Sequence, residues 1–140
     1  MGSPRIIIDT NVLISAFGWA GKPRLIFEKV LNKEFELIIS KKQFNEIKRV
    51  LNYPKLKLTD EQKLQILNNI GSTAKIIETH NNLDIIKEDP IDNMFLEAAI
   101  EHNANFIITG DNHILRIKEF QGTKILTPAD FLEEISKEKF

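Results

Sequence analysis

Short apolar runs alternate along the chain with longer segments in which apolar residues recur every three or four positions. A short run predicts a strand buried on both faces of a parallel sheet, and the longer spacing predicts an amphipathic helix. The predicted strands are Arg5–Ile8, Phe35–Ile39, Lys75–Ile77, Phe106–Thr109 and Lys124–Leu126. Strands that alternate with helices predict an α/β domain with a central parallel sheet.

Capping signals locate the predicted helices. Ser40 with Gln43, and Thr59 with Gln62, have the spacing of capping boxes, and Gly71 predicts the end of the second of these helices. The predicted helices cover 11–17, a segment from Pro23, segments following Ser40 and Thr59, then 91–102, 112–117 and a last segment that begins at Thr127-Pro128. We see no repeat and no linker, so residues 1–140 are expected to form a single domain.

Composition narrows the class of protein. A chain of 140 residues with 42% hydrophobic and 28% charged residues is long enough for one real core. The net charge of −1 gives no global field for nucleic acid, so any such site must be local. Cysteine is absent, which excludes disulfides, thiolate zinc sites and cysteine nucleophiles. No apolar run is long enough to span a bilayer and no signal-peptide pattern is present, so we expect a soluble cytoplasmic protein.

Four acids occur where predicted core elements end or turn: Asp9, Glu46, Asp92 and Asp111. Asp9 follows the run Ile6-Ile7-Ile8, and Asp111 follows the strand that ends at Thr109. Open α/β sheets bind their ligands beyond the carboxyl ends of their strands. The positions of Asp9 and Asp111 therefore indicate a ligand site if their two strands are neighbours.

Each acid also has a structural explanation when it is taken alone. Asp9 and Asp111 have the position of helix N-caps, Asp92 that of an acid near a helix N-terminus, and Glu46 that of a solvated helix residue. Together they suggest a different role. Carboxylates that converge repel one another unless a cation lies among them, and an oxygen-only ligand set favours Mg²⁺ or Mn²⁺ over zinc. Such a site is suited to phosphodiester hydrolysis.

The order of these motifs resembles the PIN domain family. The resemblance rests on Asp9-Thr10-Asn11-Val12-Leu13, on Glu46 with Arg49-Val50-Leu51, on Asp89-Pro90-Ile91-Asp92-Asn93, on Thr109-Gly110-Asp111-Asn112-His113 and on the final segment 125–132. It covers essentially the whole chain. It is closest to the stand-alone bacterial or archaeal PIN proteins that are toxin components of toxin–antitoxin pairs, related to the VapC ribonucleases.

The resemblance implies a Rossmann-like three-layer α/β/α sandwich and Mg²⁺- or Mn²⁺-dependent endoribonuclease activity. Asp9, Glu46, Asp92 and Asp111 would be both the catalytic acids and the metal ligands. Asn11 and Thr109 would be supporting polar groups that orient a ligand or water, and Asp89 is a possible outer-shell acid or a loop residue. Some relatives carry a further acid soon after the fourth, whereas here the next acid is Glu119.

Charge is uneven along the chain. Residues 41–63 carry seven bases and three acids, and residues 84–111 carry seven acids and one base. A basic rim beside an acidic pocket suits a phosphate backbone, although these lysines are equally compatible with a solvated helix face. Trp19, with Lys22 and Arg24 nearby, is a place where a base could stack, and is also a candidate contact for a dimer or an antitoxin.

The leading hypothesis from sequence is an endoribonuclease toxin, with an RNA substrate, an antitoxin partner and a homodimeric state that rests on analogy alone. The alternative is a non-catalytic PIN-like RNA-binding or interaction module. A phosphohydrolase of the haloacid dehalogenase kind would need an acid where Asn11 stands, and a receiver domain would need paired acids that Ile6-Ile7-Ile8 does not provide.

Overall fold

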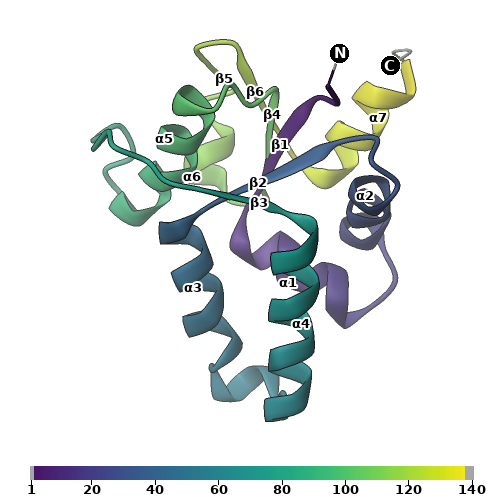
Figure 1. The fold of residues 1–140 in the computed structure, drawn as a ribbon. Helices are drawn as coiled ribbons and strands as arrows, with labels where there is room; N and C mark the ends of the chain where they lie inside the picture. The colour runs from purple at the N-terminus through teal and green to yellow at the C-terminus, as the bar shows by residue number, and fades with distance from the viewer. Residues whose placement is uncertain (1, 138–140) are drawn as a thin grey trace.

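A computed structural model describes residues 2–137 (Figure 1). Its strands are β1 (Arg5–Ile8), β2 (Glu36–Ser40), β3 (Lys75–Ile77), β4 (Phe106–Ile108), β5 (Glu119–Phe120) and β6 (Thr123–Leu126). Its α-helices are α1 (Thr10–Gly18), α2 (Lys22–Leu31), α3 (Lys41–Leu51), α4 (Asp60–Thr73), α5 (Asn93–Glu101), α6 (Asn112–Leu115) and α7 (Pro128–Lys137), with 3₁₀ turns η1 (Pro54–Leu56) and η2 (Pro90–Asp92).

The strands form one sheet in the order β3-β2-β1-β4-β6-β5. Every neighbouring pair is parallel except β5 and β6, which form an antiparallel edge hairpin. The sheet is therefore mixed, and the predicted parallel sheet is confirmed for five of its strands. The hairpin turns at Gln121 and Gly122, both with positive φ, as a tight two-residue turn requires. A strand of two residues leaves too short an apolar pattern to be recognised in the sequence.

Two cores lie on opposite faces of the sheet because neighbouring side chains on a strand point to opposite faces. In β1, Ile6 and Ile8 pack into one core and Ile7 into the other. The first core is covered by α1, α2 and α7, together with buried residues of α3 and α4. The second is covered by α5 and α6, on the other side of the sheet (Figure 1). The predicted three-layer α/β/α sandwich is confirmed.

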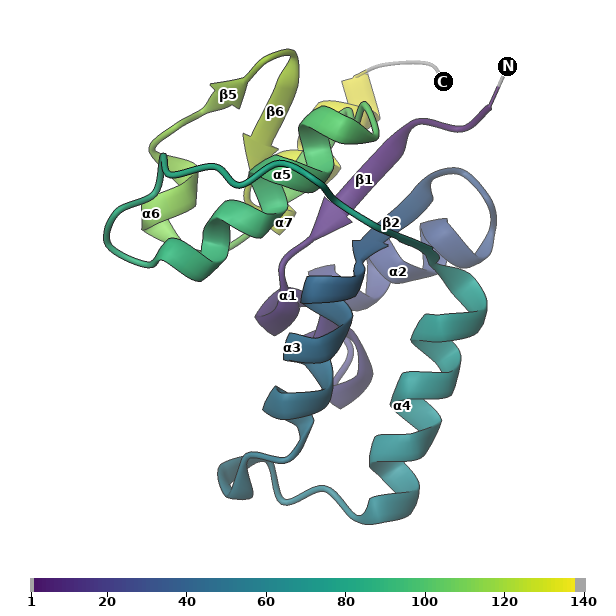
Figure 2. The ribbon, with the colours of Figure 1, turned by 60° about the vertical axis from the view of Figure 1, so that its left-hand side comes forward.

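Helices α3 and α4 both project from the sheet in the same direction and are joined through η1 (Figure 2). The capping box predicted at Thr59 and Gln62 is complete. At α3 only half of the predicted box forms: Ser40 accepts a hydrogen bond from the Gln43 amide, at 3.1 Å. The side chain of Gln43 instead donates to the carbonyl oxygen of Ile8, at 2.7 Å. This bond ties α3 to the end of β1.

The prediction that Gly71 ends α4 is wrong. The helix continues to Thr73, and the amide of Ala74 still donates to the carbonyl oxygen of Ile70 at 2.8 Å. Ile70 is fully buried, so packing against the sheet holds this last turn despite the weak helix propensity of glycine. Within residues 2–137, no helix has the length and apolarity needed to cross a membrane.

Candidate active site

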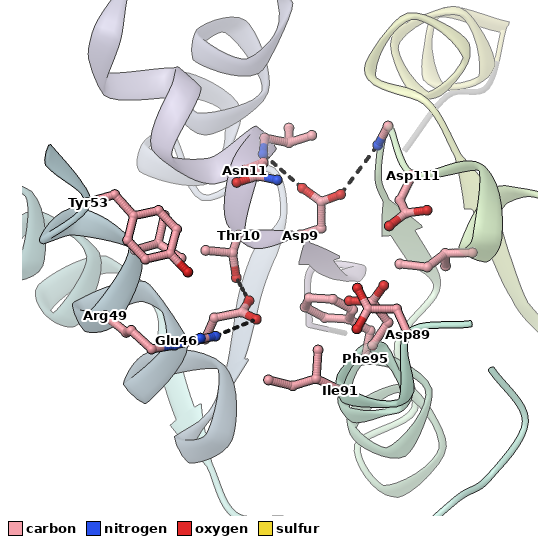
Figure 3. Close-up of a pocket in the computed structure, with 15 residues that line it drawn as sticks. Asp9, Thr10, Asn11, Glu46, Arg49, Tyr53, Asp89, Ile91, Phe95 and Asp111 are labelled. Carbon is pink, nitrogen blue, oxygen red and sulfur yellow. Dashed lines mark hydrogen bonds and ion pairs between the residues drawn. The ribbon is translucent and has the colours of Figure 1, made fainter. Parts of the chain in front are cut away.

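The adjacency of β1 and β4 brings Asp9 and Asp111 to the same edge of the sheet. Ile8 pairs with Ile108 in parallel register, so β1 and β4 end side by side at the same edge of the sheet. A cleft of about 690 Å³ opens there (Figure 3). The four predicted acids line it, as do two of the predicted supporting residues, Asn11 and Asp89.

Asp9 is held by three hydrogen bonds. Its Oδ1 accepts from the Val12 amide at 2.8 Å, which makes it the N-cap of α1. Its Oδ2 accepts from the Thr109 hydroxyl and, at 3.3 Å, from the Gly110 amide. Burial nevertheless raises the pKa of Asp9, because the loss of solvent outweighs these bonds. Asp9 is thus both a helix cap and a buried acid at the base of the cleft.

Thr109 links the acids at the ends of the two central strands. It is fully buried, and its Oγ1 also accepts a hydrogen bond from the Asp111 amide at 3.0 Å. Asp111 in turn accepts a bond from the His113 amide at 2.8 Å and caps α6. The predicted supporting role of Thr109 therefore has a geometric basis beneath the cleft. Neither His113 nor Glu119 lines the cleft.

Asp89, Asp92 and Asp111 form a tight acidic cluster, in which one oxygen of each lies within 4.8 Å of the others. Burial, and then the charges of Asp89 and Asp111, raise the pKa of Asp92 to about 7. Its Oδ2 is buried and has no hydrogen-bond partner among the described residues. A buried carboxylate oxygen left without a partner is costly, and a cation bound here would lower this cost for the ionised cluster.

Glu46 lies on the opposite wall of the cleft, carried by α3 (Figure 3). The Thr10 hydroxyl donates to its Oε1, and an Arg49 guanidinium nitrogen lies 3.6 Å from its Oε2. The side chain is only 13% exposed, so the solvated-helix explanation does not describe it. The four predicted acids thus share one cleft, but only Asp92 and Asp111 belong to the tight cluster.

The third member of the cluster, Asp89, lies in a loop whose backbone is held by Asn93, a residue to which the sequence analysis assigned no role. Asn93 is buried, and its Oδ1 accepts from the amides of Ile85 and Ile86 at 3.0 and 2.8 Å. Its Nδ2 donates to the carbonyl oxygens of Ile86 and Pro90 at 3.0 and 2.8 Å. These four bonds fold the acidic loop onto α5. The only sign of this role in the sequence was the position of Asn93 directly after the acidic turn.

Much of the predicted basic rim is neutralised. Four of its bases form ion pairs, Lys41 with Glu78, Lys42 with Glu97, Arg49 with Glu46 and Lys63 with Asp60. In the part of the chain that the structure describes, Lys55 and Lys57 have no such partner. Near Trp19, the Arg24 side chain donates to the Ala16 carbonyl oxygen at 3.1 Å and so is committed to the end of α1.

The chain matches a known protein family. A family model described as PIN domain matches residues 5–113, which include all four predicted acids. The chain belongs to the PIN domain family. PIN domains are generally nucleases, and this chain has the fold of a PIN nuclease. A sequence comparison with curated proteins gave no match.

Solved structures with the same fold have low sequence identity to this chain. PAE2754 from Pyrobaculum aerophilum has a TM-score of 0.63 at 13% identity, covering 99% of this chain and 94% of that one. VapBC2 from Rickettsia felis, bound to a DNA fragment from its promoter, has a TM-score of 0.59 at 19% identity, covering 86% and 96%. The PIN domain endonuclease Utp24 has a TM-score of 0.52 at 19% identity, covering 88% and 84%.

PIN nucleases use divalent metals, and the donors in this PIN domain fit such an ion. The cluster of Asp89, Asp92 and Asp111 offers oxygen ligands only, the set that Mg²⁺ and Mn²⁺ prefer. The unpartnered Oδ2 of Asp92 and the charge repulsion that raises its pKa are the observations that favour an ion at this place.

Proposed function

We propose that this PIN domain is a Mg²⁺- or Mn²⁺-dependent endoribonuclease that hydrolyses RNA phosphodiesters. The observation that carries the proposal is the acidic cluster with the buried, unpartnered Oδ2 of Asp92. A non-catalytic RNA-binding module gains nothing from this arrangement, because three adjacent carboxylates repel a phosphate backbone.

The residues divide into two groups in this proposal. Asp89, Asp92 and Asp111 hold the ion, which when bound lowers the pKa of water and offsets charge on the phosphate. Asp9 and Glu46 lie outside the cluster but line the same cleft, and are the candidates to accept the proton of the attacking water. Arg49 presents a guanidinium at the cleft wall, where it favours the anionic substrate.

RNA cleavage tests this proposal. Wild-type protein is expected to cleave single-stranded or structured RNA with Mg²⁺ or Mn²⁺ and to lose this activity in EDTA. Asp9→Asn, Asp92→Asn and Asp111→Asn are each expected to reduce cleavage by at least about a hundredfold. Asp60→Asn is the matched control, because Asp60 is fully exposed at the start of α4. Equal cleavage by wild type and Asp9→Asn, or cleavage that survives EDTA, would contradict the assignment.

We further propose that the protein is the toxin of a toxin–antitoxin pair, acting in the cytoplasm as a homodimer. The similarity in fold to VapBC2 supports this role. Induced expression is expected to stop growth in wild type and not in Asp9→Asn, and a small protein encoded next to it is expected to relieve the arrest. Light scattering of the purified protein is expected to give twice the chain mass of 16.1 kDa. Normal growth at equal expression would count against the toxin role.

A further inference from the structure

A second groove adjoins the acidic cleft. It encloses about 450 Å³ between α1, the η1 turn and the start of the α3–α4 connection. We call it the aromatic groove, defined by Phe17, Trp19, Tyr53 and Lys55 with the apolar side chains around them. It shares Asn11, Val50 and Tyr53 with the acidic cleft, so the two hollows are adjacent at α1 and at the end of α3.

The aromatic side chains of this groove are unusually open to solvent. Trp19 is 63% exposed and Tyr53 39% exposed, although large aromatic residues normally bury most of their surface. In Figure 3, the Tyr53 ring stands at the end of the acidic cleft opposite Asp111. Exposed aromatic faces beside a phosphodiester site are the elements of a base-stacking platform.

The groove also has a positive charge at its lining. Lys55 lines it and, among the residues that the structure describes, forms no ion pair. By contrast, Lys41, Lys42 and Lys63 are each paired with an acid. An uncommitted ammonium group next to stacking faces complements a phosphate attached to a base.

We propose that the aromatic groove binds one unpaired nucleobase of the RNA strand whose phosphodiester enters the acidic cleft. The base stacks on Trp19 and Tyr53, and Lys55 contacts the phosphate on the outer side of that nucleotide. Asn11 and Tyr53 lie where the strand passes from the groove into the cleft. Only an unstacked base can reach these faces, so the substrate is single-stranded RNA, or a loop, and not a duplex. This inference rests on the proposed ribonuclease function.

An antitoxin segment is the competing occupant of an apolar groove. The position beside the cleft and the uncommitted Lys55 favour RNA. A protein segment in this groove would have no need of a free cation unless it were acidic. The test below asks whether an RNA base occupies the groove.

Trp19 is the only tryptophan of the chain, so its fluorescence reports directly on the groove. The probe is a single-stranded RNA of about ten nucleotides, and the protein is Asp9→Asn with Mg²⁺, which is expected to hold RNA without cutting it. Binding is expected to quench the fluorescence. When an abasic site is placed at each position in turn, removal of one particular base is expected to weaken binding about tenfold.

Variants in the same background then assign that base to the groove. Trp19→Ala and Lys55→Gln are each expected to bind the intact RNA about tenfold more weakly, and Trp19→Ala to lose the dependence on the abasic position. The matched controls are Leu64→Ala, an exposed apolar residue outside the groove, and Lys57→Gln, an exposed lysine two residues from Lys55. They are expected to bind like the parent.

Three results would overturn the inference: unchanged fluorescence on binding, an abasic effect spread evenly over the strand, or equal affinity of Trp19→Ala and Leu64→Ala. Failure of the ribonuclease proposal is distinguishable, because it shows as equal cleavage by wild type and Asp9→Asn. The fluorescence and abasic measurements do not depend on cleavage.

Discussion

The hydroxyl of Thr109 joins Asp9 to Asp111 at the base of the cleft. It donates to Asp9 Oδ2 and accepts the Asp111 amide at 3.0 Å. One side chain at the carboxyl edge of the sheet therefore holds two acids that are more than a hundred positions apart in the chain. They meet through the pairing of β1 with β4.

Replacement of this hydroxyl is expected to affect both stability and activity. Thr109→Val keeps the shape but removes the donor to Asp9 and the acceptor for Asp111. Unfolding free energy is expected to fall by about 1–3 kcal/mol, and RNA cleavage by about tenfold or more. Calorimetry and cleavage rates measure the two effects. Thr109→Ser keeps the hydroxyl and is expected to retain most activity, so equal loss in both variants would contradict the role.

The structure gives Asp89 a larger role than its sequence position indicated. Asp89→Asn is expected to weaken Mn²⁺ binding about tenfold, because it removes one of three adjacent carboxylates. Asp84→Asn is the matched control: Asp84 lies in the same loop, is 76% exposed and pairs with Lys87. Calorimetric titration with Mn²⁺ compares them. Equal affinity of both variants and wild type would place Asp89 outside the metal site.

The raised pKa of Asp92 predicts how the stability of the metal-free protein depends on pH. Its pKa is about 7 in the folded protein, against 3.8 ordinarily. The folded state therefore binds the proton more tightly, and the stability from this group, complete below the ordinary value, is lost as pH rises through 7. In EDTA, Asp92→Asn is expected to melt about 5 °C or more above wild type at pH 8. The difference is expected to shrink at pH 5, and a constant difference would contradict the raised pKa.

Asn93 is expected to be needed for the geometry of the acidic loop. Asn93→Ala removes four hydrogen bonds to buried or half-buried backbone and is expected to cost at least about 2 kcal/mol of unfolding free energy. Mn²⁺ affinity is expected to fall with it, since Asp89 loses its support. Asn82→Ala, an exposed residue of the same loop, is the control. Wild-type Mn²⁺ affinity in folded Asn93→Ala would show that the loop positions Asp89 without Asn93.

Some of this protein can be predicted from its sequence because the relevant physics is local. The apolar runs at residues 5–8 and 106–108 identify buried strands, and the Thr59–Gln62 box is a contact between near neighbours. The position of Asp9 and Asp111 after two such strands also predicted that they would share an edge, on the condition that the strands were adjacent. That condition was met by the pairing of β1 with β4.

Other features depend on contacts that no local pattern encodes. Gln43 reads as half of a capping box, yet its side chain bonds to Ile8, thirty-five positions away, because α3 packs against the end of β1. In the sequence, residues 41–63 carry seven basic residues with no visible partners outside the segment. In the structure, Lys41 and Lys42 form ion pairs with acids from distant segments.

The sequence by itself determined the α/β architecture and the acids that line the cleft, because hydrophobic periodicity and residue type are local properties of the chain. Tertiary structure alone decided which acids approach one another. Asp89 joins Asp92 and Asp111 in the tight cluster, while Asp9 and Glu46 lie outside it and accept hydrogen bonds from Thr109 and Thr10. Distances of a few ångströms between carboxylates are set by how strands, loops and helices pack, and packing depends on the whole chain.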